Sequence, residues 1–313
     1  MKIKSFYNNI FHWKFLTSIL ISIIASFYAF NDFEVGEIFE IIYKINFIYI
    51  ILAVFLLLLS VYIRSLRWKL LFRSNHPLIS HLFGSQLVGY FGNNIFPMRA
   101  GELLRCVFLS RQYKIPQSKI FGTVILERFL DMFGIISLIF FAIYFLTLDI
   151  LNQNLVIVFF ILLVFLLFCL FIIYAFKFSY IGNSKILSIV SNILIGFKSL
   201  DYKNILPITF YTILIWSIYI LMVYLVQYSI NLNLSLNDVI VILIISSLAL
   251  SVPSAPANIG TFEWSVIYAM KILDISLYQQ EFAIILHLTT FIPYTILGGI
   301  FFIYYNYSIL DKE

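Results

Sequence analysis

Three ionisable residues near the start of a long apolar segment, Glu127, Arg128 and Asp131, are the strongest candidates for chemistry in this sequence. An ionised side chain at the centre of a membrane helix costs about 2.5–3.5 kcal/mol on the insertion scale, so these residues need partners or water. Glu127 and Asp131, four residues apart, share one face of a helix, and Arg128 is rotated from Glu127 by about 100°. They predict either a substrate cavity wall, where Arg128 meets phosphate and the carboxylates meet a cationic headgroup or a proton, or an internal ion-pair network.

Two other groups of polar residues lie where apolar segments are interrupted, at NNIFPMRAGE and at VPSAPANIGTFE. Proline removes a backbone donor and glycine permits unusual dihedral angles, so we expect free backbone groups there to line a polar cavity. The predicted break residues are Pro97, Gly101, Pro253, Pro256 and Gly260. The predicted substrate-binding residues at the breaks are Asn94, Arg99, Glu102, Arg105, Asn258 and Glu263.

Each of these polar residues also has a structural interpretation. Glu102 and Glu263 fall in the first turns of the segments that follow the breaks, and they could be helix-capping carboxylates. Arg105 is either a headgroup contact or an interface residue whose long side chain reaches water. Asn94 and Asn258 are either headgroup contacts or turn formers.

The composition decides the class of protein. Of the 313 residues, 62% are hydrophobic and 11% are charged, whereas a soluble domain carries about 45–50% and about 25%. This composition excludes a soluble globular enzyme and predicts an all-α polytopic membrane protein. The two cysteines, Cys106 and Cys169, are far apart and form no CxxC pattern, so we predict no disulfide, metal site or cofactor.

Long apolar runs and basic residues together predict the topology. The predicted spans are 15–30, 46–63, 120–148, 155–176, 205–228 and 282–305, and the interrupted regions are 78–111 and 236–271. Lys and Arg collect in cytoplasmic loops. We therefore interpret the basic residues after the second span, Arg64 and Arg67 among them, as cytoplasmic, and both termini as cytoplasmic.

The interrupted regions are predicted to be re-entrant. Both flanks of 78–111 are basic, so the segment enters the membrane and returns, with arms 78–94 and 100–111 longer than the roughly 10 residues that reach mid-bilayer. By the same rule 236–271 enters from the opposite face. The fold class is thus about six full spans plus two re-entrant helical hairpins.

An internal repeat relates the two halves. The offset from Pro97 to Pro256 is 159 residues, and the same offset carries the span 46–63 onto 205–222 and the span 120–148 onto 279–307. Inverted repeats with broken helices are typical of secondary transporters. We predict one integral membrane domain, 1–313, with inverted halves 1–150 and 151–313. His287 is the repeat mate of Arg128, and it is either a neutral side chain bonded to a neighbouring helix or a group that titrates with a proton gradient.

The segments NNIFPMRAGELLR at 93–105, ERFLD at 127–131 and PSAPANIGTFE at 253–263 resemble the lysylphosphatidylglycerol synthase transmembrane family, also called flippase-like. Its type member is the membrane half of the bacterial multiple peptide resistance factor. The resemblance covers essentially the whole chain and implies lipid translocation between leaflets, not lysyl transfer, since we expect the soluble aminoacyl-transferase half to be absent. The family often has a second glycine where Ala257 or Asn258 stands here.

We therefore expect an integral membrane lipid transporter, not an enzyme, in a bacterial plasma membrane. A lipid headgroup would enter a polar cavity between the two hairpins while its tails stay in the bilayer. Anionic, aminoacylated and glycosylated headgroups all stay open, as do a homo-oligomer and a partner synthase or transferase, whereas nucleic acid is not indicated.

Two alternative functions also stay open. One is an intramembrane enzyme on lipid-linked substrates, with Glu127 and Asp131 as acid, base or metal ligands. The other is an ion or small-solute secondary transporter. The chain contains no GxxxxGK[ST] motif, so we expect the energy for transport to come from a gradient, a lipid concentration difference or an ATPase partner.

Overall fold

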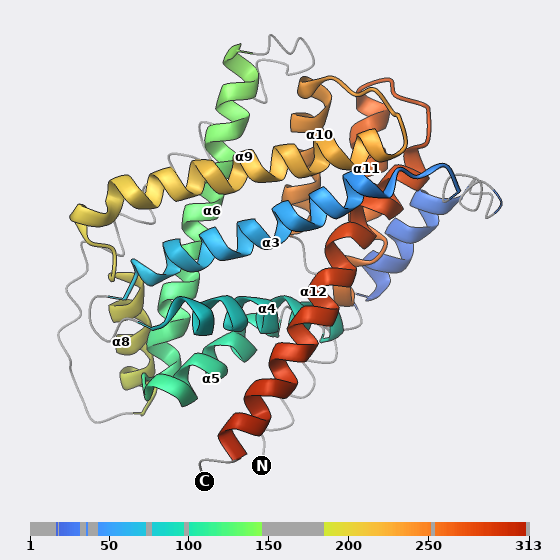
Figure 1. Cartoon of the computed structure of the whole chain (residues 1–313). Helices are drawn as coiled ribbons and strands as arrows, with labels where there is room; N and C mark the ends of the chain where they lie inside the picture. The colour runs from blue at the N-terminus through green and yellow to red at the C-terminus, as the bar shows by residue number, and fades with distance from the viewer. Residues whose placement is uncertain are drawn as a thin grey trace. The chain divides into compact units, whose positions relative to one another are not determined.

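A computed structural model of the chain describes residues 17, 19–31, 36, 43–72, 77–96, 100–145, 185–251 and 254–310. Within these residues every regular element is helical (Figure 1), which confirms the predicted all-α class. The predicted span 155–176 and the predicted site residues Pro97, Arg99 and Pro253 lie outside the described residues.

The helices follow the apolar segments of the sequence. Their bounds are α3 (Phe47–Lys69), α4 (Ile79–Ile95), α5 (Gly101–Tyr113), α6 (Gln117–Phe145), α8 (Lys185–Phe197), α9 (Ile205–Ser229), α10 (Leu236–Ala249), α11 (Thr261–Ile272) and α12 (Gln279–Leu310), with short 3₁₀ turns η2 (Tyr202–Asn204) and η3 (Pro256–Asn258). A further apolar helix covers Ile19–Phe30. Within the described residues, the segments long and apolar enough to cross a membrane are Phe47–Lys69, Tyr202–Ser229 and Gln279–Tyr305.

The chain divides into two compact units. The first consists of Met1–Val61, Gln86–Arg105 and Ser217–Glu313, and the second of Tyr62–Ser85 and Cys106–Trp216. Each unit therefore combines segments from distant parts of the sequence.

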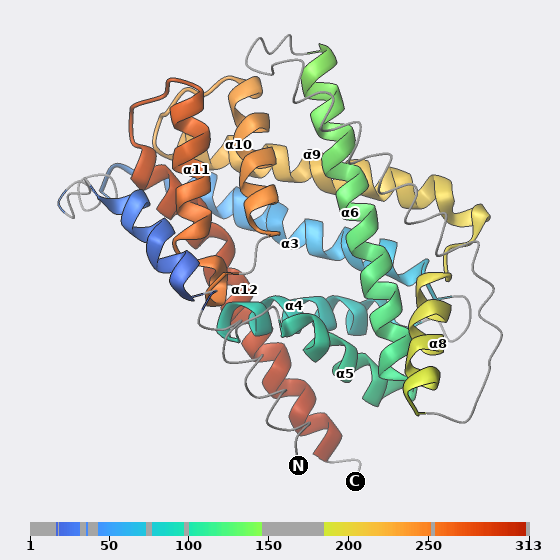
Figure 2. The same cartoon turned by 180° about the vertical axis from the view of Figure 1, so that it is seen from behind.

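In the first unit, the facing parts of α4 and α5 run antiparallel and in close contact. A Cβ added to Gly101 would collide with the carbonyl oxygen of Gly89, so the start of α5 requires a glycine. Small residues of this kind let membrane helices approach closely. The same unit packs α10 against α11 and α11 against α12 (Figure 2).

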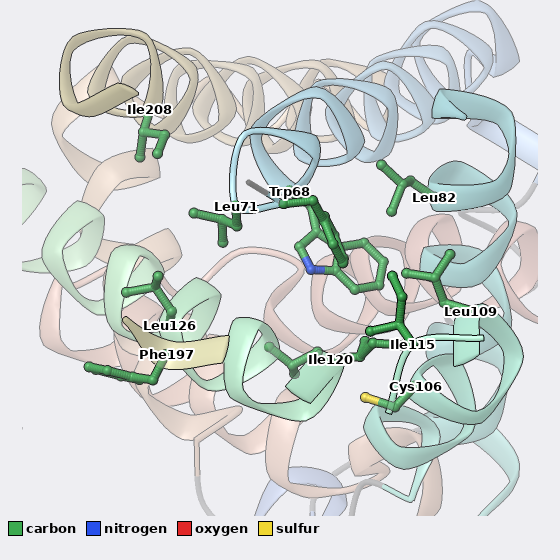
Figure 3. Packing of buried hydrophobic residues seen from close by; sticks show 12 residues of the cluster. Trp68, Leu71, Leu82, Cys106, Leu109, Ile115, Ile120, Leu126, Phe197 and Ile208 are labelled. Atoms are coloured by element: carbon green, nitrogen blue, oxygen red, sulfur yellow. The ribbon is translucent and has the colours of Figure 1, made fainter. Parts of the chain in front are cut away.

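In the second unit, α8 packs against α6 through a second pair of glycines. A Cβ on Gly122 would collide with the carbonyl oxygen of Ile193, and a Cβ on Gly196 with that of Lys119. Beside this contact lies a cluster of buried apolar side chains around Trp68 (Figure 3). This packing holds α3 and α6 in the register that forms the polar site described below.

Two parts of the fold differ from the sequence prediction. The helix predicted to end at residue 63 continues to Lys69, so Arg64 and Arg67 belong to α3 and not to a loop. Their guanidinium groups form ion pairs with Asp131 on α6. Because these charges are paired, the helix continues past both arginines. Likewise, residues 185–197, which lie between the predicted spans 155–176 and 205–228, form a further helix, α8, that packs on α6.

Candidate functional site

The second unit contains a buried cluster of charges, which we call the arginine–carboxylate cluster. Its members are Arg64 and Arg67 from α3 and Glu127, Arg128 and Asp131 from α6. A spacing of three residues places Arg64 and Arg67 on one face of α3, and a spacing of four places Glu127 and Asp131 on one face of α6. The two faces meet, so the charges of one helix are opposite those of the other.

Asp131 is the centre of this cluster. Its Oδ2 accepts from Nη1 of Arg64 at 2.9 Å and from Nη1 of Arg128 at 3.3 Å, while its Oδ1 accepts from Nη2 of Arg67 at 2.6 Å. Three guanidinium groups thus converge on one carboxylate. Charge-assisted bonds of this kind are short and about twice as strong as neutral ones.

Glu127 extends the cluster one turn along α6. Its Oε1 accepts from Nη1 of Arg64 at 3.2 Å and lies 3.9 Å from Nη2 of Arg67. Arg67 also donates to Oγ1 of Thr212 on α9 at 3.0 Å. Both carboxylates are therefore held by arginines, and the cluster ties three helices together.

Burial of the cluster is uneven. The side chains of Arg67 and Glu127 are fully buried, whereas that of Arg128 is 35% exposed. Arg128 is therefore the most exposed arginine of the cluster.

In the first unit, the break between α4 and α5 is bridged by asparagines. Oδ1 of Asn93 accepts from the backbone N–H of Gly101 at 3.0 Å, which satisfies a donor at the start of α5. Nδ2 of Asn94 donates to Oγ1 of Thr295 at 2.9 Å and to the carbonyl of Phe291 at 3.3 Å, both on α12. Asn94 therefore anchors the C-terminal end of α4, which we call the first tip, to α12.

Arg105, one turn into α5, does not extend to an exposed position. Its side chain is buried, and Nη1 donates to Oε1 of Gln86 on α4 at 2.7 Å. The interpretation of Arg105 as a residue that reaches the interface is therefore wrong. Glu102, its neighbour in the first turn of the same helix, is partly buried.

The break between α10 and α11 is held by Glu263 and His287. Oε2 of Glu263 accepts from the backbone N–H of Gly260 at 2.8 Å, as expected of a capping carboxylate. Its Oε1 lies 2.6 Å from Nδ1 of His287 on α12, and Nε2 of the same ring lies 3.0 Å from the carbonyl oxygen of Ala257. One carboxylate thus links a helix start, a turn and a second helix.

We call the turn at residues 255–260 the second tip, and its backbone is in an unusual conformation. Ala257 and Asn258 have φ angles of 59° and 58°, and Gly260 has 81°. Oδ1 of Asn258 accepts from the hydroxyl of Ser254 at 2.7 Å, which supports its interpretation as a turn former. Positive φ explains why glycine suits these positions.

The tip also contacts the helix Ile19–Phe30. The hydroxyl of Ser22 accepts from the backbone N–H of Ala255 at 2.8 Å. A Cβ on Gly260 would collide with the hydroxyl of Ser26. The second tip is therefore docked on a neighbouring helix as well as on α12.

The structure joins Glu127, Arg128 and Asp131 in an ion-pair network, which was the structural alternative of the sequence analysis. It adds Arg64 and Arg67, which sequence reasoning interpreted as loop residues. Their sequence signal, two arginines three residues apart after an apolar run, fits a loop equally well. Asn94, Glu263 and His287 lie at the hairpin tips and on α12, in the other unit.

Comparison with known proteins supports the membrane assignment. The model of the family described as "Lysylphosphatidylglycerol synthase TM region" matches residues 15–298. A UPF0104 membrane protein of Methanocaldococcus jannaschii is 28% identical over 233 residues, covering 71% of this chain and 97% of the relative. A second one from that organism is 37% identical over 99 residues, 30% of each chain.

A third relative extends the comparison to another organism. A UPF0104 membrane protein of Methanothermobacter thermautotrophicus is 33% identical over 107 residues, 33% of this chain and 32% of the relative. No solved structure gave a significant match. Since the family model covers most of the sequence and the helices are apolar, the chain is an integral membrane protein and belongs to the lysylphosphatidylglycerol synthase transmembrane family.

Proposed function

We propose that this protein moves a lipid with an anionic headgroup between the leaflets of a membrane. The headgroup passes through a polar cavity between two re-entrant hairpins while the acyl or prenyl tails remain in the bilayer. The protein forms and breaks no covalent bond. Its N- and C-termini are cytoplasmic, as the distribution of basic residues predicts.

The arginine–carboxylate cluster is the observation that carries this proposal. Ionised side chains inside membrane helices are costly and mark substrate pathways. Three arginines converge on Asp131, and the planar guanidinium group matches phosphate oxygens. Arg128, the partly exposed member, is in the position to exchange its bond to Asp131 for one to a phosphate.

The engagement of both carboxylates supports transport over catalysis. Asp131 accepts from three arginines, and Glu127 accepts from Arg64. A general acid or base needs a carboxyl group that can reach the substrate proton. A carboxylate saturated by guanidinium donors suits the role of a counter-charge.

The bounds of the helices support the re-entrant hairpins and the inverted repeat. An offset of 159 residues moves α3 to 206–228, close to Ile205–Ser229 for α9, and moves α5 to 260–272, close to Thr261–Ile272 for α11. Both second arms begin directly after a break. Their N-terminal ends carry a partial positive charge, which favours an anionic headgroup.

Hydrogen bonds join α12 to both tips. His287 bonds to the second tip, and Thr295 and the carbonyl of Phe291 bond to Asn94 of the first. A displacement of α12 therefore changes the hydrogen bonds of both tips. Coupled movement of the tips is what alternating access requires.

The test is lipid exchange by the purified protein in vesicles of phosphatidylcholine that contain a trace of fluorescent phosphatidylglycerol. Dithionite bleaches the outer leaflet only, so protein that exchanges lipid exposes the remaining fluorescence. We expect Arg128→Ala to slow exchange by about tenfold, in line with the loss of one charge-assisted phosphate contact. Arg111→Ala is the matched control, because Arg111 is exposed on α5.

The result can also contradict the proposal. Wild-type protein that leaves half of the fluorescence protected, as protein-free vesicles do, is not a lipid transporter. Uptake of a water-soluble anion without lipid exchange would instead support the small-solute transporter.

A further inference from the structure

The contact between Glu263 and His287 sets the number of protons that the pair holds. A carbonyl oxygen can only accept a hydrogen bond, so Nε2 of His287, 3.0 Å from the Ala257 carbonyl, carries a hydrogen. Nδ1 lies 2.6 Å from Oε1 of Glu263, and a contact this short requires a hydrogen between the two atoms. The pair therefore shares one proton, either as imidazolium with carboxylate or as neutral imidazole with carboxylic acid.

Loss of that proton leaves a neutral ring with a single N–H. Held on Nδ1, that hydrogen keeps the bond to Glu263, and the Nε2 lone pair then faces the Ala257 carbonyl oxygen, which repels it. The proton leaves to water, and the ring can no longer bond both Glu263 and the Ala257 carbonyl in the same position. His287 must turn or α12 must move.

The residues that His287 holds are the tip of the second hairpin. Ala257 and Gly260, which the pair binds through a carbonyl and an N–H, flank a turn with positive φ angles. Non-glycine residues in this conformation are held by their surroundings, at a cost of about 1–2 kcal/mol each. Removing the contact therefore releases a turn that is poised to relax.

The surroundings of the pair are apolar. Glu263 and His287 are both buried, and the ring of His287 lies against those of Phe262 and Phe291, with centroids 4.9 and 6.0 Å away. The titratable group that contacts His287 is Glu263 of α11. From α4, Tyr90 and Asn94 contact Tyr294 and Phe291 of α12. From the helix Ile19–Phe30, Ser22 bonds to the second tip.

We propose that the Glu263–His287 pair is the binding site of a proton that drives lipid transport. With the proton bound, the pair also bonds the Ala257 carbonyl and fixes the second tip on α12, and with the proton released, that bond is lost and the turn relaxes. The same helix also bonds the first tip through Asn94, so the proton acts on both hairpins. This inference rests on the proposed function and adds its coupling ion.

The experiment reconstitutes the full chain in vesicles with fluorescent phosphatidylglycerol and a pH indicator trapped inside. In wild-type protein, the exchange rate should differ about tenfold between the acidic and the alkaline end of a pH series, because only the protonated pair holds the Ala257 carbonyl. An imposed pH gradient should shift the lipid toward one leaflet, with protons moving at the same time, and a protonophore should abolish both effects.

Glu263→Gln is the discriminating variant. Its amide can donate to Nδ1 of His287 and accept from the Gly260 N–H, so the hydrogen bonds persist without an exchangeable proton. We expect its exchange rate to be independent of pH and its proton movement to be lost. His287→Gln should also lose the pH response, whereas Lys271→Gln, at an exposed position on α11, the helix of Glu263, should behave as wild type.

The outcomes separate the two proposals. Lipid exchange by wild-type protein that ignores pH and moves no protons overturns the coupling and leaves lipid transport intact. A Glu263→Gln protein that keeps the wild-type pH response also overturns it. Wild-type protein that exchanges no lipid at any pH overturns the proposed function and the coupling together. The wild-type measurements need no variant, so they decide the matter even where a substitution prevents folding.

Discussion

Nη2 of Arg67 lies 2.6 Å from Oδ1 of Asp131, although 64 residues separate the two in the sequence. Both groups are buried, and Arg67 is fully so. A buried ion pair adds little to stability over a well-packed apolar pair, whereas a single partner left alone is strongly destabilising. The contact therefore makes α3 and α6 dependent on each other, and it gives the first prediction.

Asp131→Ala should lower the free energy of unfolding by roughly 3–5 kcal/mol, because it removes the carboxylate that three arginines share and leaves buried positive charge uncompensated. Thermal unfolding in detergent measures the loss. Asp274→Asn, at an exposed carboxylate, should change stability by less than about 0.5 kcal/mol. Equal effects of the two substitutions would show that the cluster does not hold α3 and α6 together.

Gly101→Ala should destabilise the first hairpin by about 1–3 kcal/mol, the usual cost of overpacking. The new Cβ would collide with the Gly89 carbonyl oxygen and crowd Asn93. The control is Gly36→Ala, since a Cβ on Gly36 meets nothing within 4 Å. A stable Gly101→Ala protein would contradict the close contact of α4 and α5.

Ala257→Gly should stabilise the protein by about 1 kcal/mol, because glycine adopts a φ of 59° without the strain that a Cβ causes. Ala255→Gly is the control, and we expect it to change stability in the opposite direction. Ala255 has a φ of −58°, so glycine there should only increase the entropy of the unfolded chain and lower stability. Melting temperatures of the two variants in one detergent should move in opposite directions.

Thiol labelling tests the re-entrant hairpins. With Asn94→Cys or Asn258→Cys in reconstituted vesicles, each variant in a background with Cys106 and Cys169 replaced by alanine, a membrane-impermeant maleimide should reach the thiols through an aqueous cavity. Reaction of both thiols supports polar hairpin tips inside the membrane. Thiols that no impermeant reagent reaches from either side are surrounded by lipid, and the hairpin model would then be wrong.

Local signals predicted much of this fold. The arms 78–94 and 100–111 correspond to α4 and α5 within two residues at each end, because Pro, Gly and Asn mark a helix break by their own backbone preferences. The capping role of Glu263 was also a local prediction, and the bond to the Gly260 N–H confirms it.

Non-local contacts account for what sequence reasoning missed. Arg64 and Arg67 follow an apolar run, and the same residue types mark a cytoplasmic loop or a buried ion pair. Only the position of α6 distinguishes the two. The partnership of Glu263 with His287 likewise depends on how α11 packs against α12, which no spacing along the chain reveals.

The most direct measurement compares headgroups in the lipid exchange assay. Fluorescent phosphatidylglycerol and fluorescent phosphatidylcholine share their tails and their phosphate but differ in net charge. Wild-type protein should bring the anionic lipid to full accessibility faster than the zwitterionic one, and Arg128→Ala should remove most of that difference. Protection of half of each lipid, as in vesicles without protein, would contradict the claim that this membrane protein moves lipid.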